Sequence, residues 1–166
     1  MKAKILIIAV LFVLVGAQVI PVSAAAVKTP VSGLQTYIGD SDEQPNLKVW
    51  WVGHNGSVLQ WKNGVNLWKW DSNDPRLCGY SIFEFNENAH WTADGVMNGF
   101  NSNAKETIYT NAEYTEPIWS CQFVHTNNGG LKEECQGVGK YKGLKARIEL
   151  DMSLAFEGYI LDPAGE

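Results

Sequence analysis

A glycine-rich stretch that leads directly into a regular alternation constrains the fold of this chain most. The stretch GVGKYKGLKARIEL runs from Gly137 to Leu150. Apolar residues occupy every second position from 144 to 150, and charged residues lie between them. This period of two indicates a β-strand with one buried face, whereas a phosphate-binding loop would lead its glycines into a helix. We therefore interpret these glycines, and Gly158 further on, as positions where a curved sheet bends or needs room.

From Leu47 onward the chain shows shorter signals of the same kind. Apolar or alternating runs are separated by Asn, Gly, Asp and Pro, which favour turns. No stretch of a dozen residues after the N-terminal segment shows a persuasive helical period. We predict strands over 47–53, 57–62, 66–70, 77–85, 89–98, 104–111, 117–125, 131–137, 140–151 and 154–161. So many short strands in one small domain indicate an all-β sandwich or barrel.

The first 24 residues have the pattern of a secretory signal peptide. A short basic start precedes the uncharged apolar run from Ile5 to Ala17, and small residues at 22–24 predict cleavage after Ala24. The run is shorter than the roughly 17–25 residues that span a bilayer, so we expect export, with an uncleaved N-terminal anchor as the alternative. Residues 25–46 are rich in Pro, Gly, Ser and Asp, which predicts a leader arm with room for one short strand. Residues 47–166 then form the folded domain, with a Trp-rich hairpin at 47–70.

Charge and motif content exclude several classes of function. The chain of 166 residues has 13 basic and 18 acidic side chains, a net charge of −5, and no basic stripe. We therefore expect no nucleic-acid partner and no membrane contact beyond the signal segment. The three histidines lack the spacing of zinc ligands, and there is no Gly-x-Ser-x-Gly elbow. We expect neither a metal nor a cofactor, and the sequence gives no oligomeric state.

Three cysteines, Cys78, Cys121 and Cys135, permit three single disulfides. An exported protein favours an oxidised pair. If the hairpin SCQFVHTNNGGLKEECQ turns at Asn128, Cys121 lies directly opposite Cys135, which favours that bridge over the other two. Cys78 would then be a small buried side chain rather than a reactive thiol.

Five of the seven tryptophans lie between positions 50 and 70. Asn55-Gly56 is a strong two-residue turn signal and predicts that Trp50 pairs with Trp61 across a hairpin. Buried indoles fill a core, and exposed indoles form platforms for sugar rings; both interpretations stay open for this set, which comprises Trp50, Trp51, Trp61, Trp68 and Trp70. Trp68 and Trp70 share one face of their strand, which favours inward packing for these two.

Two segments carry a resemblance to a known family. GVGKYKGLKARIEL followed by EGYILDP resembles the C-terminal Gly-x-Gly-x-Tyr-x-Gly signature of allene oxide cyclase and dirigent-like barrels. DSNDPRLCGY, at 71–80, is similar to the SDPR-x-SGT segment of exported bacterial and archaeal proteins with the same ending. The resemblance implies a closed antiparallel barrel of about eight strands over 66–163, with an apolar interior. In those families the interior takes an oxidised fatty acid derivative or phenolic radicals. Their catalytic residues do not match positions in this chain, so their enzyme roles do not transfer.

The resemblance and the aromatic content together suggest a binder of a small apolar or aromatic molecule inside the barrel. The candidate ligand-binding residues are Tyr80, Glu84, Trp91, Tyr109 and Trp119. Glu84 is a weak catalytic candidate, because a carboxylate inside an apolar barrel would have a raised pKa; the competing interpretation is a hydrated residue near the mouth. Three alternative functions stay open: a cyclase- or isomerase-like enzyme, a carbohydrate-binding module that uses exposed tryptophans, and a structural envelope component.

Overall fold

A computed structural model describes residues 25–41, 44, 46–53, 57–125, 131–151 and 153–165. The predicted signal peptide, residues 1–24, lies outside the described residues. Within the described ranges no helix has the length and apolar character needed to cross a membrane. The described residues form nine strands and two short 3-10 helices: β1 (Val27–Asp40), β2 (Lys48–Val52), β3 (Val58–Ser72), η2 (Pro75–Leu77), β4 (Gly79–Trp91), β5 (Met97–Tyr109), β6 (Pro117–His125), β7 (Leu131–Gly137), η3 (Gly139–Tyr141), β8 (Lys145–Leu150) and β9 (Ala155–Asp162).

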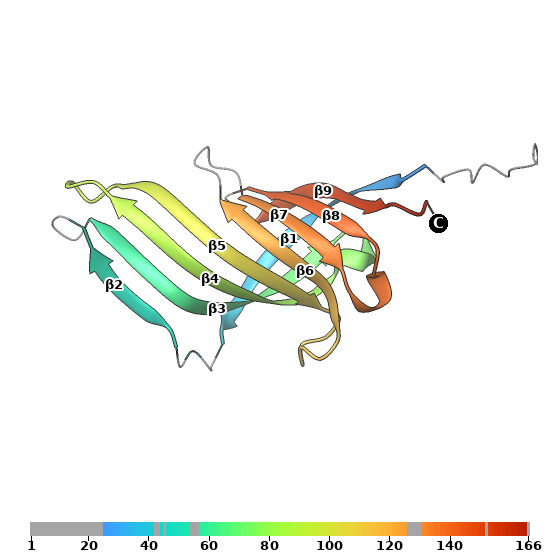
Figure 1. Cartoon of the computed structure of the whole chain (residues 1–166), viewed down its shortest axis with the longest axis horizontal. Helices are drawn as coiled ribbons and strands as arrows, with labels where there is room; N and C mark the ends of the chain where they lie inside the picture. Colours follow the sequence, from blue (N-terminus) through green and yellow to red (C-terminus); the bar gives the residue numbers. More distant parts are fainter. Residues whose placement is uncertain are drawn as a thin grey trace, which may run out of the picture.

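Eight of these strands close into an antiparallel barrel (Figure 1). The hydrogen-bonded order is β1-β9-β8-β7-β6-β5-β4-β3-β2, and an additional pairing of β1 with β3 closes the ring and leaves β2 outside it. Closure satisfies the backbone groups that an open sheet would leave at its edges. The predicted all-β class and the closed barrel of about eight strands are confirmed.

Strand β1 comes from the segment whose composition predicted a leader arm. It pairs with β9 from Val27 to Leu34 and with β3 from Gly33 to Asp40. The segment is therefore a 14-residue strand within the barrel. Proline, glycine and serine weaken its intrinsic strand preference, so its extended conformation depends on the partner strands on either side.

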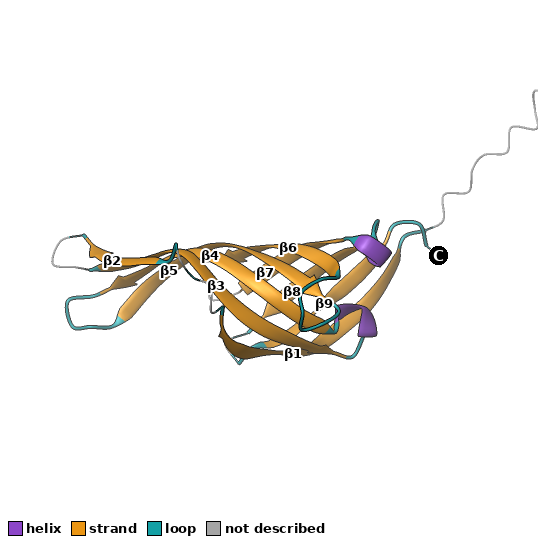
Figure 2. Cartoon of the chain, turned by 90° about the horizontal axis from the view of Figure 1, so that it is seen from below, coloured by secondary structure: helices purple, strands orange, loops and turns teal. Residues whose placement is uncertain are grey.

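Strands β3, β4 and β5 are longer than the barrel needs, and with β2 they continue as a protruding sheet (Figure 2). The predicted strands 57–62 and 66–70 are one strand, β3, with a bulge between Trp61 and Gly64. The predicted register of the β2–β3 hairpin is wrong by one residue, because Trp50 pairs with Gln60 rather than with Trp61. The last pair of the hairpin is Val52 with Val58, and the predicted turn at Asn55-Gly56 lies outside the described residues.

The barrel interior is filled mainly by apolar side chains. The largest fully buried ones, Trp70, Trp119 and Phe156, belong to β3, β6 and β9 and have no exposed surface or almost none. The predicted disulfide is confirmed: Cys121 on β6 and Cys135 on β7 are paired neighbours and are bonded. The bridge lies inside the barrel, because alternate residues of both strands face the interior.

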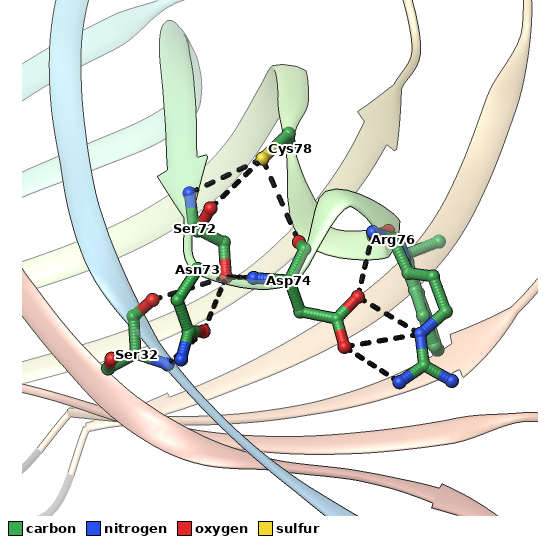
Figure 3. Close-up of polar contacts among 7 residues, drawn as sticks. Ser32, Ser72, Asn73, Asp74, Arg76 and Cys78 are labelled. Carbon is green, nitrogen blue, oxygen red and sulfur yellow. Dashed lines mark hydrogen bonds and ion pairs between the residues drawn. The ribbon is translucent and has the colours of Figure 1, made fainter.

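A tight turn after β3 closes one end of the barrel (Figure 3). Asp74 caps η2 by accepting a hydrogen bond from the Arg76 backbone N–H at 2.9 Å, and its carboxylate also binds the Arg76 guanidinium at 2.7 Å. Trp119 Nε1 donates to the Arg76 carbonyl at 2.7 Å, which fixes the buried indole against this turn. Cys78 is half-buried, and its Sγ is 3.4 Å from the Ser72 backbone nitrogen.

The glycines serve chain reversal and close packing, as expected for an architectural role. Gly139 lies in η3, Gly143 follows it with a φ of +103°, and both belong to the turn between β7 and β8. They are not part of the strand, so the predicted strand 140–151 begins only at Lys145. Gly158 on β9 faces the interior, where a β-carbon would overlap the Arg147 carbonyl oxygen.

We expect Gly158→Ala to lower the free energy of unfolding by about 1–3 kcal/mol, because the added methyl group forces β8 and β9 apart. Gly99→Ala is the matched control, since its β-carbon would meet its nearest neighbour, His90 Cβ, at an ordinary 3.4 Å. Chemical denaturation followed by tryptophan fluorescence measures both variants. Equal stability of the two would contradict the proposed crowding at Gly158.

Candidate functional site

Two glutamates face each other inside the barrel. Glu106 on β5 and Glu133 on β7 are each 1% exposed. Strand alternation places Glu106 on the inner face between Ala104 and Ile108, which are also buried. Glu133 lies on the inner face of β7, two residues before the disulfide cysteine Cys135. Carboxyl groups are almost never fully buried unless they are paired, so this pair is the most unusual feature of the interior.

The two carboxyl groups lie near each other, and side chains from three other strands donate hydrogen bonds to them. Glu106 Oε1 accepts hydrogen bonds from Trp70 Nε1 on β3, at 2.9 Å, and from Ser81 Oγ on β4. Glu133 Oε1 accepts a longer bond from Gln35 Nε2 on β1, at 3.4 Å. The site thus joins β1, β3, β4, β5 and β7 across the barrel.

The environment of the pair favours one shared proton. Burial raises the pKa of Glu133 well above its usual value, and the charge of Glu106 raises it further. Burial also raises the pKa of Glu106, but the hydrogen bonds from Ser81, Trp70 and Glu133 stabilise its charged form and oppose the rise. Glu133 Oε2 has no hydrogen-bond partner among the described residues. We therefore assign the proton to Glu133 and the negative charge to Glu106.

A carboxylic acid beside a carboxylate can donate and accept protons near neutral pH. The sulfur atoms of Cys121 and Cys135 lie within 4.8 Å of a Glu133 carboxylate oxygen. Because these sulfurs are bonded to each other, they offer no thiolate to a metal ion. The chemistry available at this cluster is therefore proton transfer and hydrogen bonding.

An aromatic layer borders the carboxyl pair at the end of the barrel from which the sheet protrudes. We call it the aromatic mouth and define it by Tyr37, Trp68, Phe83, Phe85 and Phe123. Phe83 packs against Phe123 with ring centroids 5.1 Å apart, and against Phe85 at 5.8 Å. Tyr37, which is half-exposed, meets the edge of Trp68 at 5.2 Å. The cross-strand pairs of Phe83 with Glu106 and of Phe123 with Glu133 place these rings beside the carboxyl groups.

The inner face of the barrel continues onto the protruding sheet, and we call this continuation the apron. It carries Val49, Trp51, Leu59, Trp61 and Trp91, and the exposed fractions of Val49 and Trp51 are 51% and 55%. The rings of Trp51 and Trp91 lie 6.5 Å apart and are inclined by 53°. Trp91 Nε1 is buried and has no hydrogen-bond acceptor among the described residues.

One acidic residue lies on the apron, between the mouth and the tryptophan pair. Glu87 on β4 accepts a hydrogen bond from Ser102 Oγ on β5 at 3.1 Å. Partial burial raises the pKa of Glu87, and the Ser102 hydrogen bond opposes that rise. The apron is therefore mainly apolar and aromatic, with one polar pair beside the mouth.

The five residues predicted to bind a ligand do not converge. Tyr80 and Tyr109 pair with each other on the outer face, and Glu84 is exposed on the same face. Trp119 is buried at the closed end, and Trp91 lies on the apron. Of the two sequence interpretations of Glu84, the structure matches the solvated one. In the stretch YSIFEFNEN, the side chains that face the barrel interior are instead those of Ser81, Phe83 and Phe85.

Sequence reasoning missed Glu106 and Glu133. The alternation of LKEECQG contained a usable signal, because Leu131, Glu133 and Cys135 share one face and the disulfide makes that face the inner one. For Glu106 no comparable signal exists, since charged and apolar residues mix on both faces of KETIY.

Comparison with family models, with curated proteins and with solved structures gave no match. The closed eight-stranded antiparallel barrel is therefore the part of the allene oxide cyclase and dirigent-like resemblance that the structure supports. A relationship with that family gains no support.

The shared proton predicts a pH-dependent stability. Because the folded state raises the pKa of Glu133, it retains a proton that the unfolded chain releases above its usual pKa of 4.5. The contribution of this proton to the free energy of unfolding is then complete below that pH. It falls by up to about 1.4 kcal/mol per pH unit as the pH rises toward the folded pKa. Glu133→Gln keeps a donor toward Glu106 and should remove this slope. Denaturation curves between about pH 4 and 9 test it.

The control is Glu134→Gln, which changes the neighbouring residue on the outer face, where the carboxylate pairs with Arg147 at 2.9 Å. This variant should keep the slope of the unmodified protein. A Glu133→Gln protein with an unchanged slope would show that Glu133 does not hold the proton.

Proposed function

We propose that the protein binds a small apolar or aromatic molecule on the apron, beside the rings of Trp51 and Trp91, where the inner face leaves the closed barrel. One observation carries the proposal: the row of inward-facing aromatic residues does not end with the closed barrel but continues onto an open sheet. On the inner face of β4, the buried Phe83 and the half-buried Phe85 are followed by Glu87 and Ala89, and then by the half-buried Trp91. Apolar surface of this kind, exposed beside a filled core, is characteristic of binding sites.

The filled interior favours a ligand on the open sheet over a ligand inside the closed barrel. Trp70, Trp119 and Phe156 occupy the deeper interior and are fully buried. A ligand beside Trp51 and Trp91 would cover Val49 and Trp51, each about half exposed. It could also accept a hydrogen bond from Trp91 Nε1, whose lack of a partner is costly in a buried setting.

The orientation of the rings favours a compact ligand over an extended sugar chain on the apron. Stacking platforms for sugar rings need exposed and roughly coplanar indoles, whereas Trp51 and Trp91 are inclined by 53°. Inclined rings suit a molecule held between them, with edge and face contacts.

The cysteine usage supports an oxidising compartment for this function. A disulfide between Cys121 and Cys135 persists best outside the reducing cytosol, and the N-terminal sequence has the pattern of a signal peptide. The net charge of −5 gives no attraction to nucleic acid or to anionic lipid.

The test uses Trp51→Ala and Trp50→Ala, neighbouring tryptophans that lie on opposite faces of β2. Binding of the uncharged fluorescent probe 1-N-phenylnaphthylamine is measured for both variants and for the unmodified protein. We expect Trp51→Ala to weaken binding about 3- to 10-fold, because one aromatic contact is worth about 0.5–1.5 kcal/mol, and Trp50→Ala to leave it unchanged. Equal effects, or no binding by the unmodified protein, would overturn the proposal.

A second candidate function, acid–base catalysis of a cyclase or isomerase type, is favoured by the carboxyl pair beside the mouth. The Glu133 acid and the Glu106 carboxylate could donate and remove protons on one substrate. The experiment identifies a small molecule retained on purification from the source cells and incubates it with the protein in D2O. Catalysis predicts deuterium incorporation at carbon that Glu133→Gln abolishes and Glu134→Gln preserves. Retention without exchange would leave binding as the function and exclude this chemistry.

A further inference from the structure

The face of the protruding sheet opposite the apron is covered by amide side chains. We call it the amide face and define it by Gln60, Asn86, Asn88, Asn101 and Asn103. These residues form cross-strand ladders, since Gln60 pairs with Asn88 and Asn88 with Asn101, while Asn86 pairs with Asn103. Three of the five are exposed, and two are half-buried. The sheet thus presents an aromatic side and a mainly polar side, which also carries Lys48 and Lys62.

A pocket of about 550 Å³ lies where the amide face meets the barrel. The bulge in β3 forms one wall, where Asn63 adopts a φ of +57°. The wall is held in place by two hydrogen bonds: the Asn63 backbone N–H donates to Asn86 Oδ1, and Asn63 Nδ2 donates to the Asn46 carbonyl, both at 3.1 Å. Its volume falls within the range of roughly 300–1,000 Å³ typical of small-ligand sites.

The lining of the pocket is polar and nearly neutral. Amide groups come from Gln44, Asn46, Asn63, Asn86 and Asn103, and the charges come from Glu84 and Lys105. Glu84 and Lys105 are cross-strand partners of opposite sign, so their charges largely cancel. Within the described part of the chain, the side-chain amide of Asn103 makes no hydrogen bond, and the Asn86 amide uses only its oxygen. Several donors and acceptors therefore face solvent together.

We propose that this pocket binds a neutral saccharide. A sugar hydroxyl both donates and accepts hydrogen bonds, and an amide side chain offers both functions on one rigid group. An anionic ligand would meet the Glu84 carboxylate as well as the Lys105 ammonium in the pocket lining, and an apolar ligand would leave the amides unsatisfied. Trp50 lies on the same side of the sheet, outside this lining, with Lys62 Nζ over its ring 5.8 Å from the centroid.

This site is separate from the apron, because the two lie on opposite faces of the same sheet. The saccharide proposal therefore does not depend on the apolar ligand, and a variant on one face serves as the control for the other.

The test is calorimetric titration with four neutral hexasaccharides: maltohexaose, cellohexaose, mannohexaose and chitohexaose. We expect at least one of them to bind, and we expect Asn103→Ala to weaken that binding about 3- to 10-fold, the effect of losing one or two neutral hydrogen bonds. Asn103 is exposed, so the substitution leaves the core unchanged. Trp51→Ala, on the apron, should bind the saccharide as the unmodified protein does.

A second measurement, by NMR, locates the bound saccharide and does not rely on the affinities of the variants. In the full chain labelled with 15N, the side-chain amide signals of Asn86 and Asn103 should shift on titration with the hexasaccharide that binds, while the indole signal of Trp91 should not. No binding of any of the four at about 5 mM, a range where even weak affinities of about −3 to −4 kcal/mol are detected, would overturn the proposal. So would binding that Trp51→Ala abolishes and Asn103→Ala leaves intact.

Discussion

The pairing of β1 with both β9 and β3 is the constraint on which the rest of the structure depends. Without it, the sheet would end in two open edges, and residues on its two faces would differ much less in exposure. With it, one face becomes an interior, and within the closed part of the barrel most inward-facing residues are removed from water. Gly33 and Gly158 allow this closure, because a β-carbon at either position would overlap a backbone oxygen of the adjacent strand.

Closure also explains the chemistry inside. Glu106 and Glu133 would be ordinary surface acids on an open sheet, but inside the barrel desolvation raises the pKa of each, and one proton is held between them. Trp70, Ser81 and Gln35 supply the hydrogen bonds that compensate part of that cost. Removal of one side chain from this cluster would leave its hydrogen-bond partners unsatisfied. Glu133→Gln is therefore the informative substitution, because the glutamine amide keeps a hydrogen-bond donor.

The protruding sheet arises because β3, β4 and β5 extend beyond the closed ring of the barrel. Beyond the ring no strand covers the inner face, so the aromatic residues that would be core inside the barrel become the apron. The outer face stays polar and carries the amide ladder. One sheet thus offers two surfaces of different chemistry, which is the physical basis for inferring two kinds of ligand.

Local patterns in the chain were sufficient for the β class, for most strand positions after residue 66 and for the Cys121–Cys135 bridge, because alternation and hairpin register depend on near neighbours in sequence. They failed for β1, whose composition is that of a linker, and for the face that YSIFEFNEN turns inward, because both strand faces carry apolar residues. The carboxyl pair lay beyond local reasoning, since Glu106 and Glu133 meet only across the barrel. Sequence alone determined that the chain forms antiparallel strands stapled by one disulfide, since those properties reside in short segments. Which residues share an interior was decided by the tertiary structure, because closure brings together side chains that are far apart in sequence.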